Sequence, residues 1–255
     1  MKNKSFFLLT ATAALLLSIS TGLWGLSPMR EEDYIREAAK FAEEGDYDRA
    51  IAFYSQAIQI NPNNTLTYNR RGILYLITGS QDLAIADFNQ ALRLDPNNAE
   101  AYYGRGDVYH IRGDYDRAIA DYSQVIRLNP NNADAYFDRG NLYRNKNEFN
   151  RAISDYARVI ELAPDYAPAY NRLFNTYCDK GDYDNAIKAA LKATERFPDD
   201  YDGFDNLGYG YEKKKDMARA KRAYLQAMKL APYPNPDLEN AYYNRPEAQR
   251  IINAR

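Results

Sequence analysis

The chain has 255 residues, of which 45% are hydrophobic and 27% are charged, a composition typical of a folded protein rather than a disordered one. Its 33 basic residues do not exceed its 35 acidic ones, so a nucleic-acid partner is not expected. The only cysteine, Cys178, and the only histidine, His110, exclude an internal disulfide framework and the usual metal-ligand sets, and no cofactor or metal is expected.

Residues 1–30 differ in composition from everything that follows. Two lysines near the start precede an uncharged stretch that extends to Met29 and contains the apolar run FFLLTATAALLLSIS. A cleaved export signal has positive residues first, then an apolar run, then small residues at the cleavage site. This segment has the same order and ends in the small residues of Ser18-Ile19-Ser20. Residues 6–26 are alternatively long enough to remain as a membrane anchor. Both alternatives predict that the rest of the chain is extracytoplasmic: periplasmic, secreted, or tethered to the membrane through this segment alone.

An exact repetition marks the remainder of the chain. The octapeptide GDYDRAIA occurs at residues 45–52 and again at 113–120. Six prolines, each 34 residues after the one before, give the period: Pro62, Pro96, Pro130, Pro164, Pro198 and Pro232. A fixed period of this size indicates a stacked repeat architecture. Aligning on the prolines predicts six repeats, at residues 31–64, 65–98, 99–132, 133–166, 167–200 and 201–234.

Each repeat carries the same pattern of large and small residues. The fourth and eleventh places are aromatic, the eighth is small in most repeats, and the twentieth is alanine in all six: Ala50, Ala84, Ala118, Ala152, Ala186 and Ala220. Spacings of three, four and seven place the marked residues on one face of a helix. Glycines such as Gly113 end the first helix, and the proline follows the second. Every repeat is therefore predicted to be a helix-turn-helix.

This pattern of aromatic, small, aromatic, alanine and proline places resembles the tetratricopeptide repeat family over residues 31–234. The resemblance implies an all-α fold, a right-handed α-solenoid of six 34-residue helix-turn-helix repeats. It also implies a scaffold that binds a protein or peptide partner in a concave groove, and not an enzyme. Residues 235–255 depart from the pattern and are predicted to form a C-terminal capping helix, because a stack must cover its last apolar face. A partner-binding tail is the alternative for this segment.

One position departs from the family pattern. The seventh place, commonly leucine, is arginine in repeats two to four, and the same repeats have aspartate at place 23. Repeats five and six have leucine at place seven and alanine at place 23. Because an arginine at a normally buried place needs a partner, we predict an ion pair between the two helices of each of three repeats. The predicted pairs are Arg71–Asp87, Arg105–Asp121 and Arg139–Asp155.

The residues available for catalysis are few and far apart. Cys178 and His110 both occupy place 12 but lie two repeats apart, which corresponds to a separation on the order of 20 Å. A nucleophile and its base need hydrogen-bond reach, so this pair is excluded within one chain. The chain has no glycine-rich phosphate loop either. An enzymatic activity is not expected, and an accessory to an enzyme is the least favoured function.

The resemblance also implies which residues face the groove. The apolar candidates are Ile35, Ile73, Leu76, Ile77, Tyr103, Ile111 and Phe137. The polar candidates, suited to bind a backbone or a carboxylate, are Asn141, Arg144, Asn171, Arg172 and Asn175. Tyr103 and Phe137 are expected to be the main anchors, because large aromatic residues are the commonest ones. For Leu76, Ile77 and Ile111, packing against the neighbouring repeat is the alternative.

Two further expectations concern the partner. Place five contains no lysine in any repeat, so the acidic C-terminal tails bound by chaperone-type members of the family are not expected as ligands. A different function remains open: the chain could be a structural component of an envelope assembly that acts by self-association. The sequence determines neither the oligomeric state nor the identity of the partner.

Overall fold

The computed structural model describes residues 29–231, which form twelve helices and no strand, and the expected all-α fold is confirmed. Residues 6–26 and the predicted cap at 235–255 lie outside the described residues. Within the described range, we find no helix that has both the length and the hydrophobicity needed to cross a bilayer. The right-handed twist of the solenoid and the boundaries of the six repeats stay predictions.

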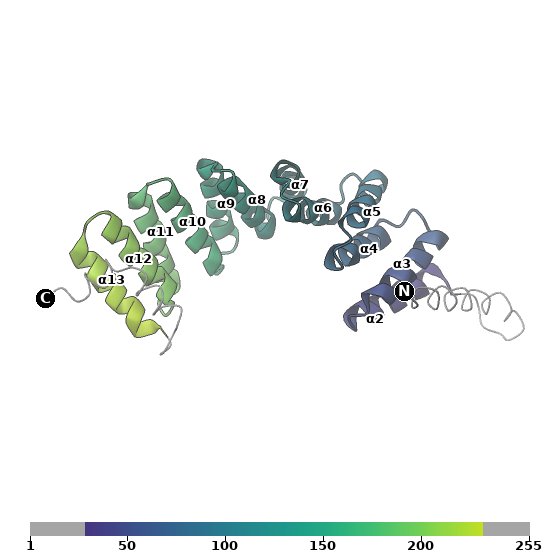
Figure 1. Cartoon of the computed structure of the whole chain (residues 1–255), viewed down its shortest axis with the longest axis horizontal. Coiled ribbons are helices and arrows are strands. Elements are labelled where there is room, and N and C mark those ends of the chain that lie inside the picture. The colour runs from purple at the N-terminus through teal and green to yellow at the C-terminus, as the bar shows by residue number, and fades with distance from the viewer. Residues whose placement is uncertain (1–28, 232–255) are drawn as a thin grey trace, which may run out of the picture. The chain divides into compact units, whose positions relative to one another are not determined.

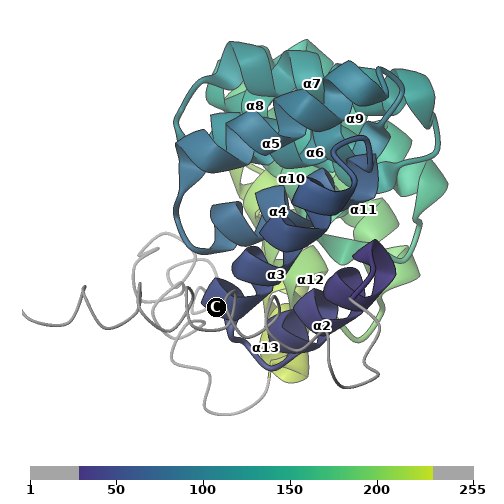
Figure 2. The same ribbon diagram turned by 90° about the vertical axis from the view of Figure 1, so that its right-hand side faces the viewer.

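The chain divides into two compact units, Met1–Pro96 and Asn97–Arg255. The described part of the first unit contains four helices: α2 (Glu31–Glu43), α3 (Tyr47–Ile60), α4 (Thr65–Ile77) and α5 (Gln81–Leu94). In it α3 packs against both α2 and α4, and α5 packs against α4 (Figure 2). The first unit is therefore a pair of helical hairpins joined through α3 and α4.

The described part of the second unit contains eight helices: α6 (Ala99–Ile111), α7 (Tyr115–Leu128), α8 (Ala133–Asn145), α9 (Phe149–Leu162), α10 (Ala167–Asp179), α11 (Tyr183–Arg196), α12 (Tyr201–Lys213) and α13 (Met217–Leu230). Each packs against the helix that follows it, as Figure 1 shows. In addition, α10 touches α8 on one side and α12 on the other. The first helices of successive hairpins thus lie next to one another.

The ends of the first helices have the backbone conformation that the sequence predicts. Gly113, which follows α6, has a φ of +74°, in the left-handed region that glycine adopts without strain. After α8 and α12 the same place is taken by Asn147 and Lys215, with φ of 59° and 60°. An aspartate precedes four of the six described second helices, as at Asp114, whose carboxylate accepts a hydrogen bond from the Arg117 backbone N–H at 3.2 Å; before α5 and α9 the same place holds Ser80 and Glu148. These local signals define each hairpin.

Small residues at the eighth place allow the two helices of a hairpin to approach closely. A Cβ atom added to Gly106 would lie 2.9 Å from the Tyr122 ring, so an alanine there would have to displace that ring. Tyr122 is fully buried, as is Ala118 on the same helix. The expected role of the small residues in helix packing is confirmed at this position.

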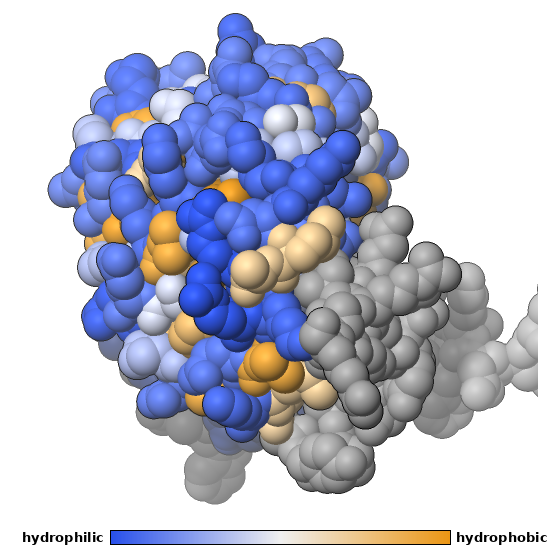
Figure 3. All heavy atoms as spheres, turned by 90° about the vertical axis from the view of Figure 1, so that its left-hand side faces the viewer, coloured by the Kyte–Doolittle hydropathy of each residue, from blue (hydrophilic) through white to orange (hydrophobic). Residues whose placement is uncertain are grey.

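The last described helix has an exposed apolar side. Met217, Leu225 and Met228 of α13 are 44%, 37% and 48% exposed. Figure 3 looks onto this end of the chain, where small hydrophobic patches interrupt a mainly hydrophilic surface. Because interior helices of the unit are covered on both sides, this is the side where a further element would extend the stack.

Candidate functional site: the face of the first helices

The three ion pairs predicted from the sequence are confirmed. Arg105 Nε and Nη2 donate to the two carboxylate oxygens of Asp121 at 2.8 and 2.7 Å, and the other two pairs have the same bidentate geometry. The Arg139 side chain is 17% exposed and the Asp155 side chain 6%, so the pairs are largely buried. Their donors and acceptors are used within the fold, which makes them structural groups rather than a ligand site.

A third partner of these arginines was not predicted. Arg139 Nη1 donates to the Ser123 hydroxyl of the preceding hairpin at 2.9 Å, and in the first unit Arg71 Nη1 donates to Ser55 at 2.8 Å. Each of these arginines therefore joins three helices. The serine lies 16 residues before its arginine, and this regular spacing is the signal from which the contact could have been found.

The predicted groove residues of the first unit differ in exposure. Ile35 is half-buried against the hydrophobic core of α2 and α3. Ile73 and Leu76 on α4 are half-buried, whereas Ile77 at its C-terminal end is 54% exposed. Part of the apolar surface of Ile35 is thus used by the fold itself. A role of these four residues in binding stays a prediction.

In the second unit the two expected anchors are half-buried and make contacts inside the protein. The Tyr103 hydroxyl on α6 donates to the Asp138 carboxylate on α8, and its ring centroid lies 5.4 Å from that of Tyr122. The Phe137 ring lies 5.9 Å from Tyr156 and 5.1 Å from Tyr166. Both rings therefore help to join neighbouring helices and offer only part of their surface to a ligand.

The remaining predicted residue of α6, Ile111, is 61% exposed. It lies four residues after Asp107, on the same side of the helix. No contact in the described part of the chain explains an isoleucine at so exposed a place, and this makes Ile111 the most accessible apolar candidate of the set.

The polar candidates make contacts within a hairpin and from one hairpin to the next. Asn141 accepts a hydrogen bond from the Tyr156 hydroxyl at 2.8 Å, and Arg144 forms an ion pair with Asp179 at 2.7 Å. Asn171 accepts from the Asn206 amide at 2.8 Å. The other two candidates are half-buried Asn175 and exposed Arg172. No side-chain hydrogen bond or ion pair of Arg172 is found within residues 29–231.

These contacts define one continuous surface in the second unit. Tyr103–Asp138 joins α6 to α8, Arg144–Asp179 joins α8 to α10, and Asn171–Asn206 joins α10 to α12. In each case the partners are 35 residues apart, one more than the repeat period. We call the surface made by α6, α8, α10 and α12 the first-helix face. The structure thus brings all the predicted polar candidates onto a single surface.

Two carboxylates on this face were missed by the sequence analysis. Asp107 accepts a hydrogen bond from the Tyr122 hydroxyl at 2.7 Å, and Asp138 accepts from Tyr103. Burial raises the pKa of Asp107 to about 6; the Tyr122 hydroxyl opposes this rise and the nearby negative charge of Asp138 adds to it. Burial also raises the pKa of Asp138. Neither forms an ion pair in the described part of the chain, but a protonated His110 would lower the pKa of both carboxyls.

A signal for the Tyr122–Asp107 contact is present in the sequence. In repeats three and four a polar residue at place 9 accepts from the hydroxyl at place 24, as Asp107 from Tyr122 and Asn141 from Tyr156, whereas repeat two has Ile73 with Phe88. Repeats one and five do not follow this pairing, because Ala39 occurs with Tyr54 and Asn175 with Ala190. The signal is therefore weaker than the one that revealed the arginine–aspartate pairs.

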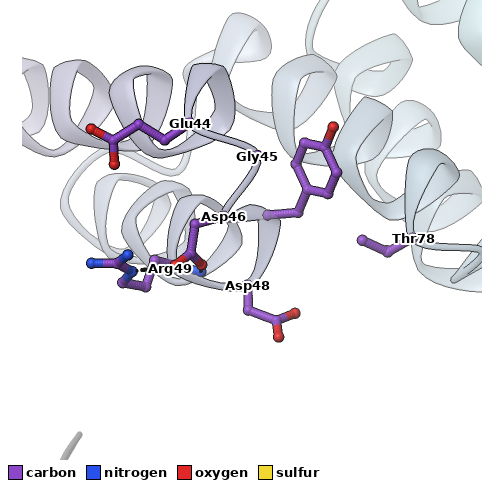
Figure 4. Close-up of a pocket in the computed structure, with 7 residues that line it drawn as sticks. Glu44, Gly45, Asp46, Asp48, Arg49 and Thr78 are labelled. Carbon is purple, nitrogen blue, oxygen red and sulfur yellow. Dashed lines mark hydrogen bonds and ion pairs between the residues drawn. The ribbon is translucent and has the colours of Figure 1, made fainter.

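A hollow lies elsewhere, at the turn between α2 and α3 in the first unit. It has a volume of about 630 Å³ and is lined by Glu44, Gly45, Asp46, Tyr47, Asp48, Arg49 and Thr78. In Figure 4 the Asp46 carboxylate bonds to Arg49, while Asp48 and Thr78 lie on the opposite side of the hollow. Similar hollows of about 440 and 400 Å³ occur at the turns that follow α6 and α8. Their recurrence shows that they arise from the repeat geometry.

The edges of these hollows are linked by contacts 30 residues apart. Lys214 pairs with Asp184 at 2.9 Å, Lys180 donates to Asn150 at 2.9 Å, and Lys146 pairs with Asp116. These exposed contacts connect successive hairpins and are each expected to contribute little to stability. At the hollow of the first unit, Thr78 takes the place of the lysine.

The two residues considered for catalysis, Cys178 and His110, lie in different surroundings. Cys178 packs against the hydrophobic cluster of α9 to α12, and burial raises the pKa of its thiol to about 11. A thiol with a raised pKa is a poor nucleophile at neutral pH. The His110 ring lies 6.3 Å from Tyr115. No group of potential ligands for a metal ion occurs among residues 29–231.

Comparison with known families agrees with the hairpin geometry. Models described as "TPR repeat" match residues 40–79, 74–111 and 106–145, and models described as "Tetratricopeptide repeat" match 133–166, 156–188 and 201–234. Together these matches span most of the chain. The chain belongs to the tetratricopeptide repeat (TPR) family.

Solved structures of TPR proteins resemble this one. A crystal structure of MamA is 32% identical in sequence, with a TM-score of 0.62, over 66% of this chain and 92% of the MamA chain. YrrB, described as a TPR protein with an unusual peptide-binding site, is 24% identical with a TM-score of 0.63, over 75% of this chain and 97% of its own. The likeness to YrrB is one of fold alone.

A shorter match links this TPR protein to a curated human protein. Serine/threonine-protein phosphatase 5 of Homo sapiens is 43% identical over 47 residues, which is 18% of this chain and 9% of the phosphatase. The match spans less than a tenth of the phosphatase and carries over none of its activity. TPR proteins are generally non-catalytic scaffolds that bind protein or peptide partners.

Proposed function

We propose that this protein is an exported or membrane-tethered TPR scaffold that holds a protein or peptide partner in a concave groove lined by the first helices. The observation that carries the proposal is the continuity of the first-helix face in the second unit. Its accessible groups include an apolar side chain, Ile111, a guanidinium, Arg172, and the carboxylates of Asp107 and Asp138. Such a mixture suits an extended polypeptide with several kinds of side chain. The peptide-binding site of YrrB is a precedent on this fold.

A photo-crosslinking experiment tests the groove. A photoreactive amino acid replaces Ile111 in the full chain, expressed in the native host. A matched control carries the same amino acid at Ala120, which is exposed on a second helix, α7. We expect a crosslinked partner from position 111 and none from position 120. Equal crosslinking at both positions, or crosslinking from position 120 alone, would contradict binding on the first-helix face.

The export part of the proposal is supported by the composition of residues 1–30, two lysines followed by a long uncharged stretch. Fractionation of cells that express the full chain with a C-terminal tag tests it. We expect the tag outside the cytoplasm, either soluble after removal of the first 20 or so residues or held in the membrane fraction. Recovery in the soluble cytoplasmic fraction would show that the export part is wrong while leaving the groove untouched.

The exposed apolar side of α13 favours a second candidate, a structural component that self-associates. Met217, Leu225 and Met228 offer a surface onto which another copy could stack. Size-exclusion chromatography of the purified protein separates the two functions. A monomer supports groove binding, whereas a concentration-dependent oligomer that Leu225→Lys dissolves supports assembly.

A further inference from the structure

The first-helix face of the second unit has two poles of opposite charge. Asp107 on α6 and Asp138 on α8 form the acidic pole, and neither forms an ion pair with a lysine or arginine within residues 97–231. The imidazole of His110 is the titratable group whose positive charge acts on both. Arg172 on α10, exposed and without a side-chain partner in the same range, forms the basic pole. Asp138 and Arg172 occupy the same place on α8 and α10, and these two helices are in contact. Burial raises the pKa of the Tyr156 hydroxyl, the charges of Arg172 and Arg144 oppose this rise, and the charge of Asp138 adds to it. The poles are thus close neighbours on one surface.

The acidic charge at Asp107 is not needed for packing. One repeat further along, the same tyrosine-to-place-9 contact is made by Tyr156 and the neutral amide of Asn141, at 2.8 Å. Likewise, the contact that joins Tyr103 to Asp138 is made between two amides, Asn171 and Asn206, two repeats later. An asparagine would therefore satisfy the same geometry without the cost of a half-buried charge. The chain retains carboxylates at both places of the acidic pole.

A cation from outside would remove that cost. Two neighbouring half-buried carboxylates repel each other, and an ammonium or guanidinium group placed between them would replace repulsion by attraction. The free guanidinium of Arg172 in turn suits a carboxylate, with which it can form two parallel hydrogen bonds. Charge complementarity therefore specifies the partner: it must present both signs, in the order of the two poles.

We propose that the first-helix face of the second unit selects an extended peptide segment that places a basic side chain at Asp107 and Asp138 and an acidic group at Arg172. Asp138 and Arg172 occupy the same place in successive repeats, whose neighbouring helices are roughly 10 Å apart. An extended chain advances about 3.3 Å per residue, so the two charges of the peptide are about three residues apart. Exposed Ile111 beside the acidic pole adds an apolar contact. This inference rests on the groove function proposed above.

Selection from a random nonapeptide library displayed on phage, with the full chain as bait, tests the inference. We expect the enriched peptides to carry a lysine or arginine about three residues from an aspartate or glutamate, in one constant order. Asp107→Asn is compatible with the fold, since Asn141 occupies the equivalent place. Combined with Asp138→Asn, it should weaken the binding of the selected peptides at least tenfold, and Arg172→Gln alone should weaken it by a similar factor. Asp184→Asn, an exposed acid at the turn edge, is the matched control and should leave affinity unchanged.

The outcomes distinguish a failure of this inference from a failure of the proposed groove function. Enriched peptides without paired charges that nevertheless compete at Ile111 would overturn this inference and leave groove binding standing. Peptides with the charge pattern whose affinity is unchanged by Asp107→Asn alone and by Arg172→Gln would also overturn it. If no peptide is enriched on the full chain, both the inference and the proposed groove function fail. The thermal melting of each variant must match that of the parent for these comparisons.

Discussion

Two neighbouring hairpins of the second unit fill the same interior position with opposite chemistry. Between α8 and α9 the position holds the Arg139–Asp155 ion pair, and between α10 and α11 it holds Leu173 and Ala189, which share one hydrophobic cluster. Both solutions are compatible with the same helix packing. The comparison shows that the position requires two matched residues rather than a particular kind of residue, because an unmatched partner is what costs free energy.

Removing one member of the Arg139–Asp155 ion pair is expected to have the largest effect on stability. Asp155→Ala leaves the Arg139 guanidinium buried without a counter-ion, in contact with the Ser123 hydroxyl and the rings of Tyr136 and Tyr143. We expect the free energy of unfolding to fall by about 3 kcal/mol, since removing one member of a buried pair leaves its charge uncompensated. Urea denaturation followed by circular dichroism measures the loss, and hydrogen exchange should locate it in α8 and α9. Asp184→Ala, which removes an exposed ion pair, should cost less than about 1 kcal/mol. Equal losses in both variants would contradict this account.

A smaller effect of opposite sign on the free energy of unfolding is expected at Asp107, which forms no ion pair in the described part of the chain. The pKa of Asp107, about 6 in the fold against 3.8 for an ordinary aspartate, means that folding favours its protonated form. Its stabilising contribution is therefore complete below about pH 4 and is lost as the pH rises through 6. Asp107→Asn, which keeps an acceptor for the Tyr122 hydroxyl, should stabilise the protein by about 1–2 kcal/mol at pH 7.

Urea midpoints of the parent and of Asp107→Asn, measured between pH 4 and pH 8, test whether the substitution stabilises the protein as the pH rises. The difference between the two proteins should be close to zero at pH 4 and grow up to about pH 7. A constant difference over this range would show that the carboxyl titrates as an ordinary one.

The smallest effect is expected when one hairpin is converted into the other. The double substitution Arg139→Leu with Asp155→Ala gives the hairpin of α8 and α9 the pair found in α10 and α11. Stability should stay within about 1 kcal/mol of the parent, because a buried ion pair can be exchanged for matched apolar residues at little net cost. Ser123 keeps its hydrogen bond to the Ile119 carbonyl at 2.6 Å. A loss as large as that of Asp155→Ala would show that the charges themselves are required.

The repeats made part of this structure predictable. Six aligned copies showed that arginine and aspartate occur together, so a contact across 16 residues was found without an alignment of relatives. The helix ends followed from glycine and aspartate at fixed places. The acidic pole was missed, because the pairing of places 9 and 24 holds in only some of the repeats. Contacts between hairpins, such as Tyr103–Asp138, were harder to predict because their spacing of 35 residues differs from the period.

The sequence by itself determined the helices, their pairing into hairpins and the ion pairs inside them, since all of these depend on interactions within about one repeat of chain. Only the tertiary structure decided which side chains remain available to a partner. Tyr103 and Phe137, the strongest anchors by sequence, share their surface with neighbouring helices, whereas Ile111 and Arg172 remain accessible. Exposure depends on how successive hairpins pack on one another, and no single repeat specifies that packing.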